Sequence, residues 1–145
     1  MSREVSGAEQ QKARSFKDLT VWQKSMDLAV GVYQLTANFP RDEQFRITAQ
    51  LTRAVASVPA NIAEGHARGT RRDYAYFVSV AQGSLAETET FLVLVQRPGY
   101  TGGEHFEAMM ELLREVSRML AALHARLRSP PAAPGRANDA HARHG

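Results

Sequence analysis

The residues of this chain that could do chemistry are histidines, carboxylates, hydroxyls and a short run of arginines. The histidines stand at positions 66, 105, 124, 141 and 144, with no two spaced by four and no glutamate three residues before one. Helices that bind metal ions present such pairs on one face, and the chain has no cysteine to supply thiolate ligands. We therefore expect no metal and no cofactor.

A catalytic acid–base pair has one candidate, Glu64 beside Gly65 and His66. General acid–base or nucleophilic catalysis needs a partner group at a recognisable spacing, and none stands near this pair. Gly83-Ser84 lacks the G-x-S-x-G pattern of a nucleophile elbow. The sequence therefore predicts no catalytic residue, and a binding function rather than an enzyme.

The segment from His66 to Arg72 concentrates positive charge just before a predicted helix. Arginine binds phosphate in a bidentate manner, and the free amides and dipole at the start of a helix also favour anions. A second interpretation is a solvated loop whose arginines pair with Glu64 or Asp73. Arginines upstream could extend the cluster if they face the same way. The candidate nucleic-acid-binding residues are His66, Arg68, Arg71, Arg72, Arg53 and Arg46.

A polar motif surrounds Pro59, which should kink or break a helix because it lacks an amide and clashes with the preceding turn. Four polar residues at spacings of seven, four and three would share one helix face. They could form a binding constellation, or a hydrogen-bond network that satisfies the carbonyls freed by Pro59; the network is the favoured interpretation. Gly65 suits a left-handed helix end. The motif consists of Gln50, Ser57, Pro59, Asn61, Glu64 and Gly65.

Hydrophobic residues recur at spacings of three and four along four segments, which predicts four α-helices. The segments cover about residues 21–38, 42–64, 71–97 and 103–128. Capping patterns that begin at Thr20, Thr70 and Thr101 predict the starts of three of them. Because short connections force successive helices to run antiparallel, the fold class is an all-α, up-down-up-down four-helix bundle, with the second helix kinked at Pro59.

The apolar faces of the last two predicted helices can be read from their spacing. On the third, the expected buried residues are Tyr74, Phe77, Ala81, Ser84, Thr88, Phe91 and Val95. On the fourth, they are Phe106, Met109, Leu113, Val116, Leu120, Leu123 and Leu127.

Near the end of the third predicted helix, five successive residues are apolar: Phe91, Leu92, Val93, Leu94 and Val95. Successive residues of a helix are about 100° apart, so this run covers every side of the helix, more than one core can bury. We expect it to lie in a subunit interface, although the neighbouring loop and the fourth helix could cover it instead.

The chain has 145 residues, which fits a single domain with polar ends. Residues 1–17 are expected to be a polar arm, 18–128 the bundle, and 129–145 a disordered Pro- and Ala-rich tail. The formal net charge is +3, with 15 arginines and 3 lysines, which permits nucleic-acid binding without requiring it. No signal-like start and no membrane-spanning run occur in the sequence, so we expect a cytoplasmic location and no membrane partner.

Three blocks of this sequence resemble the bacterial four helix bundle protein family. They are Phe16–Met26, Gln50–Gly65 and Ala81–Glu87, the last preceded by Arg72-Asp73-Tyr74-Ala75-Tyr76-Phe77. The run Ser-Val-Pro-Ala-Asn-Ile-Ala-Glu-Gly, at 57–65, is the most specific. The family includes proteins encoded by intervening sequences in large-subunit ribosomal RNA genes, and it resembles the accessory variability proteins of diversity-generating retroelements.

The resemblance implies ring-like homopentamers of four-helix bundles. In the retroelement relatives, basic surfaces bind nucleic acid and a reverse transcriptase, and most family members have no known activity. Here Arg97-Pro98 departs from the family pattern before Gly99-Tyr100, which puts the loop before the fourth helix in doubt. The predicted function is a non-enzymatic, homo-oligomeric protein that binds RNA or DNA or acts as a scaffold. The alternative is an adaptor for a protein such as a polymerase, with no nucleic-acid contact.

Overall fold

The computed structural model describes residues 15–96 and 103–130, except for the side chains at 43–45. Within these ranges all regular structure is helical, and four long helices confirm the all-α four-helix class. The elements are the 3-10 turn η1 (Phe16–Asp18), α2 (Thr20–Thr36), α3 (Arg41–Glu43), the π-helical segment η2 (Gln44–Thr48), α4 (Ala49–Ala67), α5 (Arg71–Gln96) and α6 (Gly103–Arg128).

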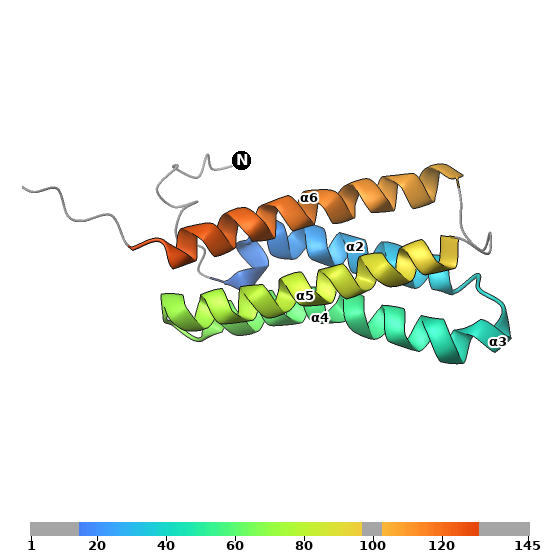
Figure 1. Ribbon diagram of the computed structural model, residues 1–145, viewed down its shortest axis with the longest axis horizontal. Coiled ribbons are helices and arrows are strands. Elements are labelled where there is room, and N and C mark those ends of the chain that lie inside the picture. The colour runs from blue at the N-terminus through green and yellow to red at the C-terminus, as the bar shows by residue number, and fades with distance from the viewer. Residues whose placement is uncertain (1–14, 97–102, 131–145) are drawn as a thin grey trace, which may run out of the picture.

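The four long helices pack around one core, each beside its neighbours in the chain. α4 packs on α2 and α5, and α6 packs on α5 and α2, so α2 and α5 occupy opposite corners of the bundle. Figure 1 shows α2 and α5 running from left to right and α4 and α6 running back. The start of α5 and the end of α6 therefore lie at the same end of the bundle, and α3 lies at the other.

The apolar seam of α6 follows its sequence pattern. Phe106, Met109, Leu113, Val116 and Leu120 are buried as predicted, while Leu123 and Leu127 are partly buried against the edge of the core. Alternating steps of three and four keep these residues on one side of a helix, where α5 and α2 cover them. The predicted bounds of this helix agree with those observed.

The buried face of α5 differs from the predicted one. Its buried residues are Val78, Ala81, Leu85, Thr88, Leu92 and Val95. Three of these were predicted, whereas Tyr74, Phe77, Ser84 and Phe91 are only half-buried. Both sets of residues follow the same spacing of three and four, so periodicity alone cannot separate them. Packing against both α4 and α6 decides which of the two stripes is buried.

The second predicted helix is divided. α3 gives way to the π-helical η2, and only then does the regular α4 begin, which extends to Ala67 rather than ending at Glu64. A π-helical turn inserts an extra residue per turn and so rotates the face that follows it. α4 continues through the buried Pro59 as one uninterrupted helix, so the chain does not break there. The kink at Pro59 stays a prediction.

Two of the predicted helix ends can be compared with the structure. Thr20 does not cap α2: the N-cap is Leu19, without a side-chain bond, and the Gln23 side chain donates to the Lys17 carbonyl at 2.8 Å. Thr70 behaves as predicted, because its hydroxyl accepts from the Asp73 amide at 3.2 Å. Thr101 lies outside the described residues.

The start of the described chain belongs to the packed domain. Phe16 lies in η1 and meets Trp22 edge-on, with ring centroids 5.3 Å apart. The polar arm was predicted to extend to residue 17, yet its last residues contact α2. Residues 1–14 and 131–145, which hold the rest of the predicted arm and nearly all of the predicted tail, lie outside the described residues.

Candidate nucleic-acid interface

The predicted arginines do not all share one surface. Arg46 lies in η2, at the opposite end of the bundle from the turn between α4 and α5 (Figure 1). Arg53 lies partway along α4, where its guanidinium binds Glu87 Oε1 at 2.6 Å and Gln50 Oε1 at 3.2 Å. This ion pair ties α4 to α5 and uses the charge that was expected to bind phosphate.

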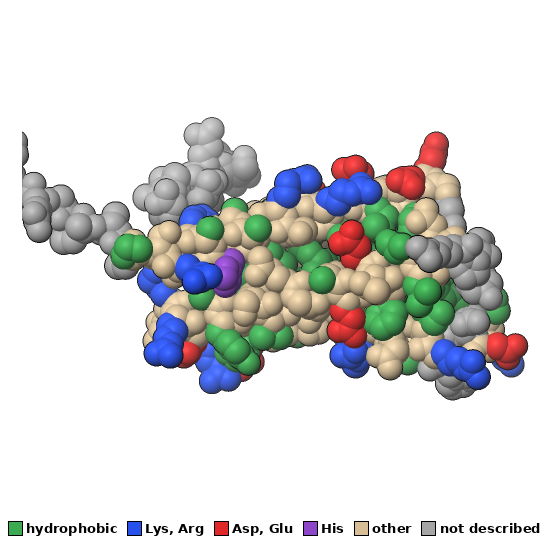
Figure 2. Space-filling view, in the orientation of Figure 1, with side chains coloured by type: hydrophobic (Ala, Val, Ile, Leu, Met, Phe, Trp, Pro, Cys, Tyr) green, Lys and Arg blue, Asp and Glu red, His purple; other side chains and the backbone are tan. Residues whose placement is uncertain are grey.

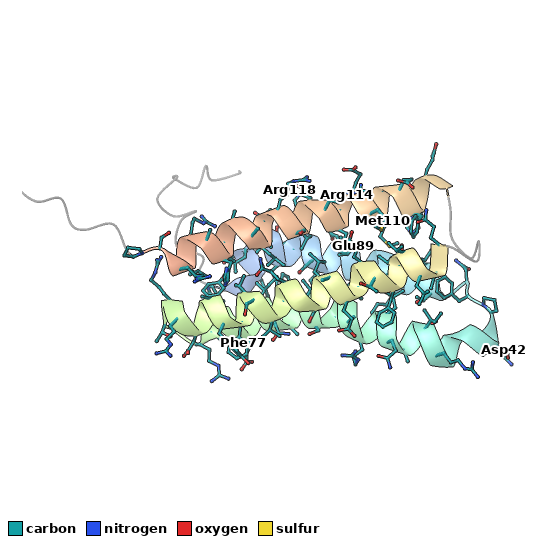
Figure 3. The ribbon with its side chains drawn as sticks, in the orientation of Figure 1. Asp42, Phe77, Glu89, Met110, Arg114 and Arg118 are labelled. Atoms are coloured by element: carbon teal, nitrogen blue, oxygen red, sulfur yellow. The ribbon has the colours of Figure 1, made fainter. Side chains whose placement is uncertain are left out.

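Arg68 is also engaged within the protein. Its guanidinium binds Glu64 Oε1 at 2.7 Å and lies 5.0 Å from the centre of the Phe77 ring. Phe77 projects from α5 near the turn that joins it to α4 (Figure 3). The pairing with Glu64 was the second interpretation of the arginine segment, and for Arg68 the structure agrees with it.

Arg71 has a structural role at the end of α6. Its Nη2 donates to the carbonyl of Arg126 and, at 3.1 Å, to that of Ser129. The last carbonyls of a helix have no partner within the helix, and a cationic side chain stabilises them. Arg71 therefore fastens the start of α5 to the end of α6.

This junction of α5 and α6 forms a groove of about 550 Å³, hereafter the basic groove. Its lining residues are Arg71, Arg72, Ala75, Tyr76, Ser79, His124, Leu127, Arg128 and Ser129. Figure 2 shows Lys and Arg side chains around a histidine at this end of the bundle. Within the described ranges, neither Arg72 nor Arg128 forms an ion pair. Both side chains are exposed, so their charges are available to an anionic ligand.

The α6 side of the basic groove was not predicted from the sequence. His124 and Arg128 come from the last two turns of α6, more than fifty residues after Arg71. The signal was present, since an antiparallel bundle places the end of the fourth helix beside the start of the third. Of the six predicted residues, only Arg71 and Arg72 line the groove.

His66 lies outside the basic groove, half-buried near the end of α4. Its ring meets that of Tyr74 edge-on, with centroids 5.8 Å apart. The Tyr74 hydroxyl is buried and has no hydrogen-bond partner among the described residues. Burial raises the pKa of Tyr74 above its ordinary value, and the nearby charge of Arg126 opposes this.

The polar motif joins α4 to α5. The Ser57 and Ser84 hydroxyls lie 2.8 Å apart across the two helices, and Asn61 Nδ2 donates to Ser57 Oγ at 2.9 Å. The carbonyl that loses its helical donor at Pro59 is that of Val55, four residues earlier. Asn61 donates instead to the Ser57 carbonyl at 2.7 Å. The Ser57–Ser84 bond therefore links two helices, while both Asn61 bonds stay within α4. None of the three involves the Val55 carbonyl, so their role differs from the predicted repair around Pro59.

Gly65 is not a left-handed helix end. It is buried inside α4, and the positive φ of this turn belongs to Gly69, at 84°. A Cβ added to Gly65 would lie 2.8 Å from Phe77 Cβ and 3.2 Å from the Tyr74 carbonyl oxygen. Glycine is needed here because the backbones of α4 and α5 approach too closely for a side chain.

The predicted interface run is split between inside and outside. Leu92 and Val95 are fully buried in the core of their own bundle and cannot reach a partner. Phe91 is half-buried, and only Val93 and Leu94 are exposed, by 40% and 49%.

A larger apolar surface lies between α2 and α4, in a groove of about 750 Å³ that we call the apolar groove. Met26, Val30 and Tyr33 form its α2 wall, and all three are exposed. Small residues of the polar-motif segment form its α4 wall, and no residue that lines the groove carries a formal charge. That wall consists of Ala56, Pro59, Ala60 and Ala63.

No group of His, Asp and Glu side chains among the described residues is arranged to hold a metal ion. No helix within the same part of the chain is both long and apolar enough to cross a membrane.

The fold and the sequence define a helical-bundle protein with one basic and one apolar groove, and comparisons give its family. Residues 17–122 match the model of the 23S rRNA-intervening sequence protein family, and the chain belongs to that family. It is similar to a protein of unknown function from the S23 ribosomal protein family of Bacteroides thetaiotaomicron. That crystal structure has a TM-score of 0.67 and 26% identity, over 72% of this chain and 98% of the other. No curated protein matches the chain.

Proposed function

We propose that this chain is a non-enzymatic, homo-oligomeric protein that binds the phosphate backbone of nucleic acid in the basic groove. The observation that carries the proposal is the convergence of Arg72 and Arg128, from two helices, on one groove without a carboxylate partner among the described residues. Arginines placed in this way neutralise phosphates and release counterions. The family's name refers to 23S rRNA, which makes RNA the first nucleic acid to test.

The proposal is tested by measuring the affinity for RNA and DNA oligonucleotides at about 50 and 200 mM salt. The decisive variant is Arg72→Glu with Arg128→Glu, which leaves the structural arginines Arg68 and Arg71 in place. We expect an affinity loss on the order of a hundredfold at low salt, because two phosphate contacts are lost and two repulsions gained.

The matched control reverses two arginines away from the basic groove, Arg46→Glu and Arg118→Glu. Arg118 lies along the outer side of α6 (Figure 3). This variant has the same net charge as the groove variant, so equal losses in the two would mean that only overall charge matters. Such a result, or no binding by the unmodified protein, would refute the proposal.

Self-association is proposed through the apolar groove, with a second copy of this chain as its occupant. The lining residues of the groove carry no formal charge, so the occupant must be uncharged as well. The outer face of α5 offers such a surface in Gly83, Ala86, Thr90, Val93 and Leu94, all exposed. Nothing lies within 4 Å of a Cβ added to Gly83, so a second helix can approach closely there.

The groove and the α5 face are different patches at different corners of the bundle, so this contact is heterologous. Heterologous contacts close into rings when the rotation allows, which agrees with the pentamer implied by the family resemblance. Val30→Glu and Leu94→Glu should each reduce the mass in light scattering to that of a monomer. A monomeric unmodified protein, or an unchanged mass in both variants, would refute the contact.

The alternative function is a protein adaptor, which the apolar groove favours if it accepts a helix of another protein. A purified polymerase retained by this chain at both low and high salt, with no nucleic acid bound, would support that function. Loss of that retention in Val30→Glu, while Leu94→Glu keeps it, would assign the groove to a foreign partner.

A further inference from the structure

One large aromatic side chain in the basic groove is not used by the bundle. Tyr76 is 63% exposed, the highest value among the exposed large hydrophobic residues. It lies one helical turn after Arg72 on α5 and lines the groove with His124 and Arg128 of α6. An exposed ring gains little packing free energy from the core. Its position among cationic side chains therefore suggests a ligand that contacts both the ring and the cations.

The Tyr76 ring has an aromatic neighbour on its own helix. Its neighbour Phe77 meets it edge-on, with ring centroids 5.2 Å apart and planes at 79°. The Arg68 guanidinium lies on the Phe77 ring and is paired in turn with Glu64. A series of contacts therefore runs from Glu64 through Arg68 and Phe77 to the Tyr76 ring.

A cationic groove with an exposed aromatic ring matches the chemistry of unpaired nucleic acid. Phosphates are neutralised by arginines, and a base stacks on the aromatic face, whatever its sequence. Bases inside a duplex are already stacked on each other, so their faces cannot reach a side chain. The volume of the groove lies within the range of pockets that hold nucleotide-sized ligands.

We infer that the basic groove binds unpaired nucleotides, with one base stacked on Tyr76 and the flanking phosphates held by Arg72 and Arg128. The inference rests on the proposed function, because it names the form of nucleic acid that the groove accepts. His124 lies on the α6 side of the same groove, where its ring can contact the nucleotide opposite Tyr76.

The test compares three probes, each about 12 nucleotides or base pairs long. They are single-stranded RNA, duplex RNA and an abasic strand with the same number of phosphates. We expect the single strand to bind about tenfold more tightly than the abasic strand. Tyr76→Leu should remove that advantage and leave duplex binding within about twofold, because the arginines are intact. Tyr76→Trp should restore it, with quenching of the new indole fluorescence by the stacked base.

His105→Leu is the matched control, since His105 carries an exposed ring near the start of α6, outside both the basic and the apolar groove. Its affinity for the single strand should not change. If single-stranded, duplex and abasic probes bind alike and Tyr76→Leu changes nothing, the inference is wrong while the proposed function stands. If no probe binds, or the Arg72→Glu, Arg128→Glu variant binds as the unmodified protein does, the proposed function is wrong as well.

Discussion

The basic groove and the apolar groove differ in how the fold builds them. The basic groove joins the start of α5 to the end of α6 and depends on a long-range bond from Arg71 to the α6 carbonyls. The apolar groove lies along α2 and α4, where exposed Met26, Val30 and Tyr33 stand against small residues of α4. In the proposed function the basic groove binds a charged polymer and the apolar groove binds an uncharged helix of a second copy.

The first prediction separates the two grooves by their response to salt. Nucleic-acid affinity should fall on the order of tenfold between about 50 and 200 mM salt, since counterions compete with the two phosphate contacts of Arg72 and Arg128. Self-association should be unchanged or slightly stronger, because burial of apolar surface is not screened. Binding titrations and light scattering on the same samples measure both. Equal weakening of the two would remove the distinction.

The second prediction concerns the close contact between α4 and α5. α4 lines the apolar groove, and α5 lines the basic groove. Gly65→Ala should lower the free energy of unfolding by about 2 kcal/mol, because the new methyl group overpacks the contact with Phe77 and the Tyr74 carbonyl. Denaturant unfolding measures the change.

Gly31→Ala is the control for that variant. Its added Cβ would meet Met109 Sδ at an ordinary 3.7 Å, so better helix propensity should stabilise the protein by up to about 1 kcal/mol. Similar effects in the two variants would mean that the α4–α5 contact is looser than the 2.8 Å approach at Gly65 indicates.

A smaller effect is expected from the polar link between the same helices. Ser57→Ala removes the partner of both Ser84 Oγ and Asn61 Nδ2, and should cost about 1 kcal/mol of unfolding free energy. Ser79→Ala should cost less than about 0.5 kcal/mol, because that exposed hydroxyl bonds only within its own helix. A loss of nucleic-acid affinity in Ser57→Ala at full stability would instead favour a binding role for the motif.

The smallest effect should come from Tyr74→Phe. The hydroxyl is buried without a partner among the described residues, so its removal should leave stability within about 0.5 kcal/mol at neutral pH or raise it slightly. Burial raises the pKa of Tyr74 in the folded state, so the unfolded chain loses that proton first as the pH rises. The unmodified protein should therefore lose stability relative to Tyr74→Phe above about pH 10. Thermal unfolding across pH 8–11 measures the difference, and parallel pH profiles would contradict it.

The candidate site was less predictable than the fold, and particular residues show why. The run from His66 to Arg72 lies at the same end of the bundle as the basic groove, but within the protein Arg68 pairs with Glu64 and Arg71 bonds to α6. Spacing along one helix reports a residue's neighbours on that helix only. It does not report the groove partners His124 and Arg128, because these arrive from another helix.

The sequence by itself determined the helical class, the bounds of α6 and its buried seam, because these follow from local periodicity and from one apolar stripe. The tertiary structure decided which of two equally spaced stripes of α5 is buried and why position 65 must be glycine. It also decided which arginines remain free for a ligand. The physical reason is that burial, close backbone approach and ion pairing depend on neighbouring helices, and the distances to those neighbours are set only when the bundle packs.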